Sequence, residues 1–177
     1  MATLRVARRQ ILKGVGIGAL GGVLAALGPT TALADDEDGH EGEGHEHHNA
    51  QEIGRRWCDA WNSHNVGQVL AVYTDNVFFE DVTLGLVARG SAEWAKLVQL
   101  TFTGVPDYHV QCVNTAVHGG HGVIEWIASG TDVGFFKTGK PFSVRGASVI
   151  VLRGRRISRE SDYYDAATVM REVGILH

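Results

Sequence analysis

Two aspartates stand where a carboxyl group could transfer protons. Asp81 closes a short segment that is rich in Phe and Val. Asp162 stands on a later segment, where alternation places it on one side with Ser158, Glu160 and Tyr164. A carboxyl group among apolar side chains resists ionisation, so its pKa rises toward neutrality, where acid–base catalysis is effective. The alternative is structural: Asp81 could form the turn that follows it, and Asp162 could bond the neighbouring strand.

The globular part of the chain is richer in large aromatic side chains than a bare core of its size requires. These residues are Trp57, Trp61, Trp94, Trp126, Phe78, Phe79 and Phe102. Together they could form the wall of a pocket for a small lipophilic molecule. For any single one of them, ordinary core packing is the simpler interpretation.

Other reactive residues give weaker patterns. His118 and His121 flank a Gly-Gly turn and could bind a metal, but no third ligand is evident nearby, so we expect a solvated turn and no metal site. His109 stands on a strand segment without a clear role. Cys58 and Cys112 could form a disulfide in an oxidising compartment, or could both be small buried apolar residues. No serine–histidine–aspartate elbow, phosphate-binding loop or Cys-x-x-Cys motif is present.

The hydrophobic pattern predicts helices before strands. Helical spacing is predicted over Ala50–His64, Val66–Tyr73, Ser91–Phe102 and Ala166–Val173. Strands are predicted over Val77–Val82, Tyr108–Val117, Gly122–Thr131, Phe142–Leu152 and Arg156–Tyr164. Between the first strand and the third helix, Gly85 and Gly90 indicate a loop. Helices followed by a run of strands joined by glycine-containing turns predict an α+β domain, with helices on one face of an antiparallel sheet.

This layout resembles the cone-shaped NTF2-like superfamily, and within it the SnoaL-like polyketide cyclases and their relatives. The resemblance covers nearly all of residues 50–175. It rests on Trp61-Asn62, on the stretch from Tyr73 to Asp81, on Ala88-Arg89-Gly90, on the stretch from Gly139 to Gly146, and on Ile157 with Asp162-Tyr163-Tyr164-Asp165. It implies a curved antiparallel sheet packed against three helices around an apolar pocket for a small lipophilic ligand, and a fold that often forms homodimers.

The resemblance also implies roles for individual residues. Asp81 matches the general base of similar ketosteroid isomerases, and Asp162 matches the acid/base aspartate of similar polyketide cyclases and limonene-type epoxide hydrolases. The implied reaction is a cyclisation or isomerisation of a lipophilic carbonyl compound without a cofactor. The residues expected to contact the substrate are Trp57, Trp61, Phe79, Trp126, Ser148 and Tyr164.

The chain departs from these relatives at several positions. Trp57 and Ser148 occupy the places of the tyrosine and aspartic acid with which ketosteroid isomerases stabilise an enolate. Trp126-Ile127-Ala128 replaces the Arg-x-Asp pair of the epoxide hydrolases, and Glu125, the counterpart of a cyclase polar residue, could face outward. These departures keep two other functions open: a module that binds a small apolar molecule without changing it, and a dimeric interaction domain.

The N-terminus has the three parts of an export signal. Arg5, Arg8, Arg9 and Lys13 form a basic head, Gly14–Leu27 is an apolar run of 14 residues, and Ala32-Leu33-Ala34 is a small-x-small cleavage site. The stretch Arg8–Lys13 resembles a twin-arginine signal. It implies recognition by the twin-arginine export machinery, cleavage near Ala34, and a periplasmic or secreted protein without a membrane segment. A retained membrane anchor is the weaker alternative, because the apolar run is shorter than the roughly 18 residues that a membrane span needs.

The segment 35–49 is a separate acidic linker between the signal (1–34) and the domain (50–177). It holds 7 acidic residues, no Lys or Arg, and the histidines His40, His45, His47 and His48. With no large apolar residue it should be disordered, either as a solvated spacer or as a metal-scavenging tail. Without residues 1–34 the chain keeps 12 of its 16 basic and all 20 acidic residues. The resulting charge of −8 predicts that it does not bind nucleic acid.

Overall fold

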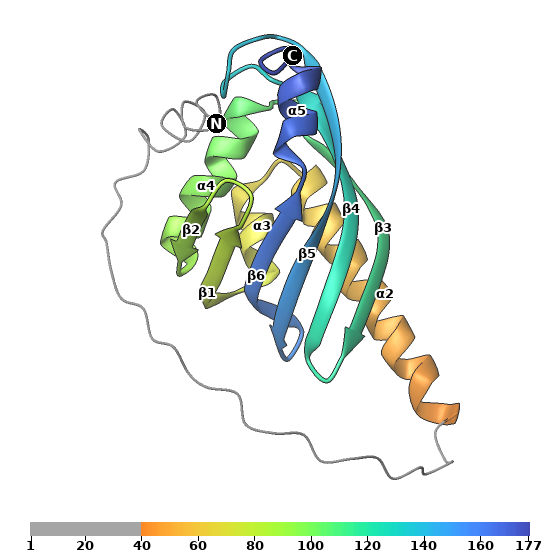
Figure 1. Ribbon diagram of the computed structural model, residues 1–177. Coiled ribbons are helices and arrows are strands. Elements are labelled where there is room, and N and C mark those ends of the chain that lie inside the picture. The colour runs from red at the N-terminus through yellow and green to blue at the C-terminus, as the bar shows by residue number, and fades with distance from the viewer. Residues whose placement is uncertain (1–39) are drawn as a thin grey trace, which may run out of the picture.

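The protein, seen as a computed structural model, is described over residues 40–177, with side chains from Ala50 onward. The predicted signal peptide, its cleavage site and residues 35–39 of the linker lie outside the described residues. Four helices and six strands follow one another in the order α2 (His40–Asn62), α3 (Val66–Ala71), β1 (Tyr73–Asp81), β2 (Leu86–Arg89), α4 (Ser91–Gly104), β3 (His109–His118), β4 (His121–Thr131), β5 (Pro141–Arg153), β6 (Arg156–Tyr164) and α5 (Ala166–Glu172) (Figure 1). No helix in this part of the chain is long and apolar enough to cross a membrane.

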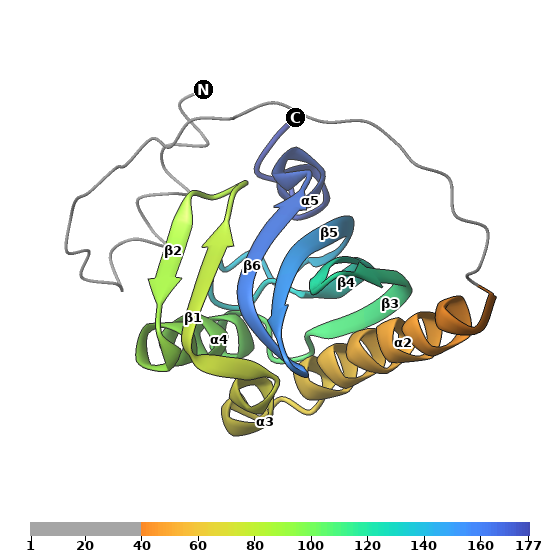
Figure 2. The ribbon, with the colours of Figure 1, turned by 90° about the horizontal axis from the view of Figure 1, so that it is seen from below.

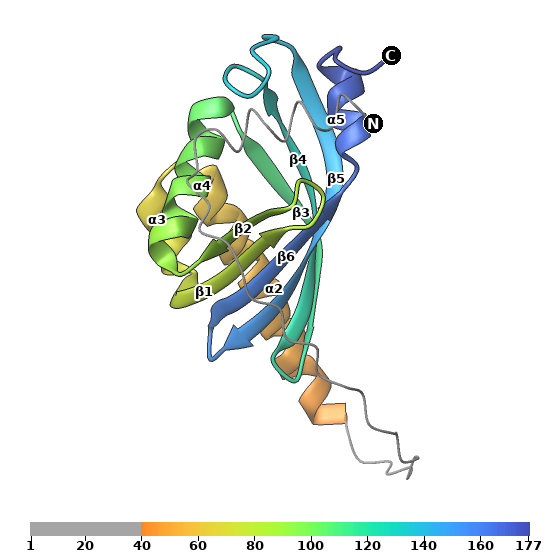
Figure 3. The same cartoon turned by 60° about the vertical axis from the view of Figure 1, so that its left-hand side comes forward.

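The six strands form one curved, unclosed sheet in the order β2-β1-β6-β5-β4-β3. Helices α2, α3 and α4 lie on the concave side of the sheet, and α5 packs beside β5 (Figures 2 and 3). The α+β class and the curved sheet are therefore confirmed. The buried core lies between the sheet and these helices, and its largest fully buried side chains include Trp94, Tyr73, Ile124 and Ile150.

The sequence predicted a wholly antiparallel sheet, but one pair of strands is parallel. β1 pairs with β6 in parallel, whereas every other pair is antiparallel. Hydrophobic alternation reports which face a residue occupies, but not which distant strand lies beside it. Parallel neighbours need a long crossover, and here the connection from β1 to β6 contains most of the domain. Strand β2 was also missed: it has only four residues, too few for a clear alternating pattern.

Helix α2 begins at His40, before the predicted start at Ala50, so it includes residues 40–49 of the segment that the sequence predicts as a disordered linker. The packed part of α2 favours this extension, because each further turn of a helix that has already formed needs no new nucleus.

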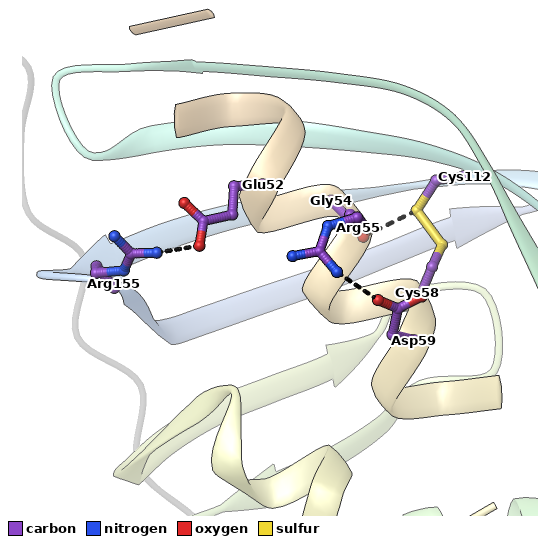
Figure 4. Close-up of polar contacts among 7 residues, drawn as sticks. All are labelled: Glu52, Gly54, Arg55, Cys58, Asp59, Cys112 and Arg155. Atoms are coloured by element: carbon purple, nitrogen blue, oxygen red, sulfur yellow. Dashed lines mark hydrogen bonds and ion pairs between the residues drawn. A yellow bond between two sulfur atoms is a disulfide. The ribbon is translucent and has the colours of Figure 1, made fainter. Parts of the chain in front are cut away.

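A disulfide between Cys58 and Cys112 fastens α2 to β3, which resolves the alternative that the sequence left open. The two Cα atoms are 6.2 Å apart, and Cys112 Sγ lies 3.1 Å from the carbonyl oxygen of Gly54 (Figure 4). The helix approaches the strand so closely that a Cβ on Gly54 would lie 2.0 Å from Thr115 Oγ1. At the end of α2, the Asn62 side chain exchanges two hydrogen bonds of 2.8 Å with the backbone of Val110. These contacts hold α2, which carries Trp57 and Trp61, against the sheet.

The convex face of the sheet carries exposed apolar side chains. Val123, Val149 and Tyr163 are 41%, 45% and 48% exposed. The strand registers pair Val123 with Val149 and Ala147 with Tyr163, so these residues occupy adjoining positions. The homodimer implied by the resemblance stays a prediction.

Candidate functional site

A cavity of about 190 Å³ lies between the concave face of the sheet and the helices. An apolar cavity of roughly 150 Å³ is large enough to hold benzene, so this one suits a small organic molecule. Its walls are mostly aromatic and aliphatic. They include the predicted residues Trp57, Trp61, Phe79, Asp81, Trp126, Asp162 and Tyr164, together with Trp94, Tyr108, Asp132, Phe135, Phe136 and Met170. No described Lys, Arg or His lines it.

Asp81 and Asp162 are side by side on the floor of the cavity. The parallel register of β1 and β6 pairs Asp81 directly with Asp162. Asp81 Oδ2 accepts a hydrogen bond of 2.9 Å from the Tyr164 hydroxyl, and Asp81 Oδ1 accepts one of 2.7 Å from the backbone N–H of Leu84. This carboxylate organises the β1–β2 turn, as the structural interpretation predicted, and it also lines the cavity, whereas its catalytic role stays a prediction.

Asp162 is supported from the neighbouring strands. Its Oδ1 accepts a hydrogen bond of 2.6 Å from the Ser148 hydroxyl, and the Ser148 oxygen accepts one of 2.9 Å from Trp126 Nε1. Ser148 does not line the cavity. It is fully buried and stands directly opposite Asp162 in the β5–β6 register. A Cβ on Gly146 would lie 2.2 Å from Trp126 Cη2, so that glycine makes room for the indole ring.

A third carboxyl group, that of Glu160, was not predicted as a site residue. It stands two residues before Asp162 on β6 and does not line the cavity. Its Oε2 accepts hydrogen bonds from the Tyr73 hydroxyl at 2.7 Å and from Trp57 Nε1 at 3.3 Å. Trp57 Nε1 also lies 2.9 Å from the Tyr73 hydroxyl oxygen. Glu160 is completely buried. Its alternation with Asp162 signalled a place on the inner face, but Tyr73 was expected at the end of a helix and not on β1.

Burial shifts the titration of all three carboxyl groups. Desolvation raises the pKa of Asp81 and of Glu160, although hydrogen bonds oppose it in both. The pKa of Asp162 is well above its usual value, first because of desolvation and then because of the negative charge of Glu160. The Tyr164 hydroxyl stays neutral and available as a donor, because burial and the charge of Asp81 raise its pKa well above the usual value.

Two more cavity residues lacked a sequence signal. Tyr108 precedes β3 and lines the cavity. Asp132 accepts hydrogen bonds from the backbone N–H groups of Phe135, Phe136 and Thr138 at 2.9 to 3.1 Å. Burial acts to raise the pKa of Asp132, but these hydrogen bonds hold it below the usual value. Asp132 thus fixes the loop that places Phe135 and Phe136 at the cavity.

The weaker candidates lie elsewhere. Glu125 faces the outer side of the sheet, where it is 3.8 Å from Arg145 in a largely exposed ion pair. His109 is exposed at the start of β3, and His118 and His121 stand at the β3–β4 turn. The described residues hold no group of three side chains that could bind a metal ion.

Solved structures with this fold come from several bacteria. A hypothetical protein with a ketosteroid isomerase-like fold from Catenulispora acidiphila, in complex with trimethylamine, is 24% identical over 70% of this chain and 93% of its own, with a TM-score of 0.65. A protein from Jannaschia sp. CCS1, proposed to be a SnoaL-like polyketide cyclase, is 16% identical over 79% and 97%, with a TM-score of 0.63. An epoxide hydrolase of the limonene type from M. tuberculosis is 17% identical over 72% and 91%, with a TM-score of 0.60.

At these identities the similarity establishes the fold and not the reaction. No curated protein matches the chain. The model of the SnoaL-like domain family matches residues 54–160, which include the C-terminal part of α2, the disulfide, the sheet as far as Glu160 and most of the cavity wall. The chain therefore belongs to the SnoaL-like domain family.

Proposed function

We propose that this protein is a cofactor-independent enzyme of the isomerase or cyclase type, acting on a small lipophilic carbonyl compound. The observation that carries the proposal is the pairing of Asp81 with Asp162 on the floor of an apolar cavity. Burial raises the pKa of both carboxyl groups, and a raised carboxyl pKa favours acid–base catalysis. The aromatic walls bind and orient the carbon skeleton, and they exclude water from the reacting atoms.

The experiment for this proposal is a substrate screen with single variants. Ketones, epoxides and polyketide-like esters that fit the cavity are incubated with the wild type, Asp81→Asn and Asp162→Asn. Turnover by the wild type that both variants lose supports the proposal. If the wild type binds these compounds but converts none, and both variants bind equally well, the enzyme proposal fails.

A second candidate function is the binding of a small amine. The charged side chains on the cavity wall are all aspartates, and aromatic rings surround them. Carboxylates and aromatic faces together attract an organic cation. The structure from Catenulispora acidiphila contains trimethylamine, which supports the same ligand class in this fold.

Three cyclohexane derivatives that differ in one substituent distinguish an amine-binding site from a site for a neutral substrate. If the site is an amine site, cyclohexylamine should bind at least about ten-fold more tightly than cyclohexanol, a difference of about 1.4 kcal/mol. Cyclohexanecarboxylate should bind most weakly, because the described residues of the cavity wall include no Lys, Arg or His. Titration calorimetry at neutral pH measures all three. Tighter binding of cyclohexanol than of cyclohexylamine contradicts the amine candidate and favours a neutral substrate.

We also propose that the protein works in the periplasm or outside the cell, after export by the twin-arginine machinery. The Cys58–Cys112 disulfide supports this location, because disulfides persist in oxidising compartments. Cell fractionation of a variant with Arg8 and Arg9 replaced by Lys tests it. The variant should remain in the cytoplasm, and its appearance in the periplasm would contradict the twin-arginine route.

A further inference from the structure

The buried Glu160 has one satisfied and one unsatisfied oxygen. Oε2 receives the Tyr73 and Trp57 hydrogen bonds, whereas Oε1 is buried without a donor among the described residues. A buried carboxylate oxygen without a donor is costly, and native proteins rarely leave one. A proton on a neighbouring carboxyl group would supply the missing donor.

Asp162 is the neighbour that can supply this proton. It lies two residues along β6, on the same inner face, and its charge and that of Glu160 raise the energy of the doubly ionised pair. Two adjacent buried carboxyl groups cannot both ionise easily, and they commonly hold one proton between them. A proton held between these two groups would give Glu160 Oε1 its donor and would remove the repulsion.

We propose that Glu160 and Asp162 share one proton at neutral pH, and that this proton makes Asp162 the proton donor of the site while Asp81 is the base. The assignment rests on the proposed function and divides the roles of its residues. Glu160 does not line the cavity, so it is a positioning residue that acts through Asp162.

The hydrogen bonds decide where the proton and the charges reside. Two donors, Tyr73 and Trp57, stabilise negative charge on Glu160. Asp81 likewise has two donors, from Tyr164 and Leu84. Asp162 has one donor, Ser148. Because hydrogen bonds to a carboxylate favour its ionised form, Asp162 is the group that keeps the proton.

Among the described residues, no Lys, Arg or His is one of the main influences on the charges of this pair. The titratable groups that act on the pair are Tyr73 and Asp81 on β1, Tyr164 on β6 and Tyr108 before β3. α2 contributes the neutral indole of Trp57, and β5 contributes the hydroxyl of Ser148. The tyrosines are neutral, because burial raises the pKa of each one well above its usual range.

The resulting reaction conserves protons at every step. Asp81 takes a proton from the carbon beside the carbonyl group, and the electron pair of the broken C–H bond forms the C=C bond of an enol. The carbonyl oxygen meanwhile receives the proton of Asp162. In the return step Asp81 gives its proton to another carbon of the enol system, and the enol O–H returns its proton to Asp162. The three carboxyl groups together carry one proton before and after this cycle.

This division of roles also defines the substrate class. The substrate has a carbonyl oxygen that reaches Asp162 and an acidic C–H bond above Asp81. It carries no carboxylate or phosphate, because an anion would face the charges of Glu160 and Asp81 without a described cation on the cavity wall. An enolisable ketone with a compact apolar skeleton meets these conditions.

The test detects the proton itself and needs no substrate. In the full chain with ¹³C-labelled Asp and Glu carboxyl groups, NMR and infrared spectra are recorded as the pH is raised. The wild type should hold one protonated carboxyl group of this pair at neutral pH. In Glu160→Gln the repulsion disappears, so the pKa of Asp162 should fall by about 1 unit or more. In Tyr73→Phe, Glu160 loses a donor, and the proton should shift toward Glu160.

Glu125→Gln on the outer face is the matched control, and it should leave the signals of the pair unchanged. The inference is overturned if both carboxyl groups are ionised at neutral pH in the wild type, or if neither inner variant moves the titration of Asp162. The wild-type spectrum alone decides the first point even if a variant fails to fold. A shared proton without turnover of any ketone would overturn the proposed function and the roles of donor and base, and would leave the shared proton itself standing.

Discussion

Replacing Asp162 by Asn is expected to lower the turnover number about 10²- to 10⁴-fold, the usual contribution of a positioned acid or base. Asparagine has nearly the same shape and can still accept the Ser148 hydrogen bond, but it has no carboxyl proton to transfer. The apolar walls are unchanged, so KM should change little. Steady-state kinetics on a substrate found in the screen measures both quantities.

Glu125→Gln removes a carboxylate from the outer face and should keep full activity. Asp81→Asn should lose as much activity as Asp162→Asn, because each aspartate makes one of the two proton transfers. An Asp162→Asn variant that retains turnover within a factor of about three of the wild type would remove Asp162 from the chemistry.

The same substitution has an expected effect on stability. Burial raises the pKa of Asp162 in the folded chain, whereas an unfolded chain has the ordinary value of about 3.9. A raised carboxyl pKa supports the fold below the unfolded value, and this contribution is lost as the pH rises through the folded value. The Asn side chain does not titrate, so Asp162→Asn does not lose stability in this way. The free energy of unfolding of the variant relative to wild type should therefore increase as the pH rises from the unfolded to the folded pKa of Asp162.

Reduction of the Cys58–Cys112 disulfide is expected to lower the free energy of unfolding by about 4 kcal/mol. The bridge closes a loop with a sequence separation of 54 residues, and the chain-entropy estimate for such a loop is about 4 kcal/mol. Domains of this size commonly have only about 5–15 kcal/mol of stability. Urea denaturation with and without reductant, followed by tryptophan fluorescence, measures the difference.

The control for reduction is the variant with both cysteines replaced by Ser, which should be as unstable as the reduced wild type and insensitive to reductant. Ligand binding should also weaken on reduction, because α2 carries Trp57 and Trp61 into the cavity. A loss of less than about 1 kcal/mol in both samples would mean that the bridge does not constrain the unfolded chain as this account requires.

The sequence pattern predicted where the strands lie along the chain, but it did not predict which strands are neighbours in the sheet. Alternation predicted β3 to β6 within a few residues, and Asn65 at the predicted break caps α3 through a 3.1 Å hydrogen bond from the Gln68 N–H. The parallel pairing of Asp81 with Asp162 was not predictable, because no local pattern specifies which distant strands pair. For the same reason the spacing of the cysteines could not decide the disulfide.

The site was predictable only in part. Alternation from Asp162 pointed to Glu160, and the aromatic content pointed to an apolar wall. Tyr108 and Asp132 come to the cavity through loops, where no periodicity applies. Trp57 and Ser148, which differ from the enolate-stabilising residues of ketosteroid isomerases, have another use here: they donate hydrogen bonds to Glu160 and Asp162. The departures from the relatives therefore serve the carboxyl pair.

Hydrogen–deuterium exchange at carbon is a direct measurement of proton transfer by Asp81 and Asp162. Small enolisable ketones that bind the cavity are incubated in D₂O with the wild type, Asp81→Asn or Asp162→Asn, and proton NMR follows the C–H signals beside the carbonyl. We expect the wild type to exchange these hydrogens for deuterium, and both variants to bind the ketones without exchanging them. Binding of the ketones by the wild type with no exchange above the uncatalysed rate would contradict proton transfer by Asp81 and Asp162.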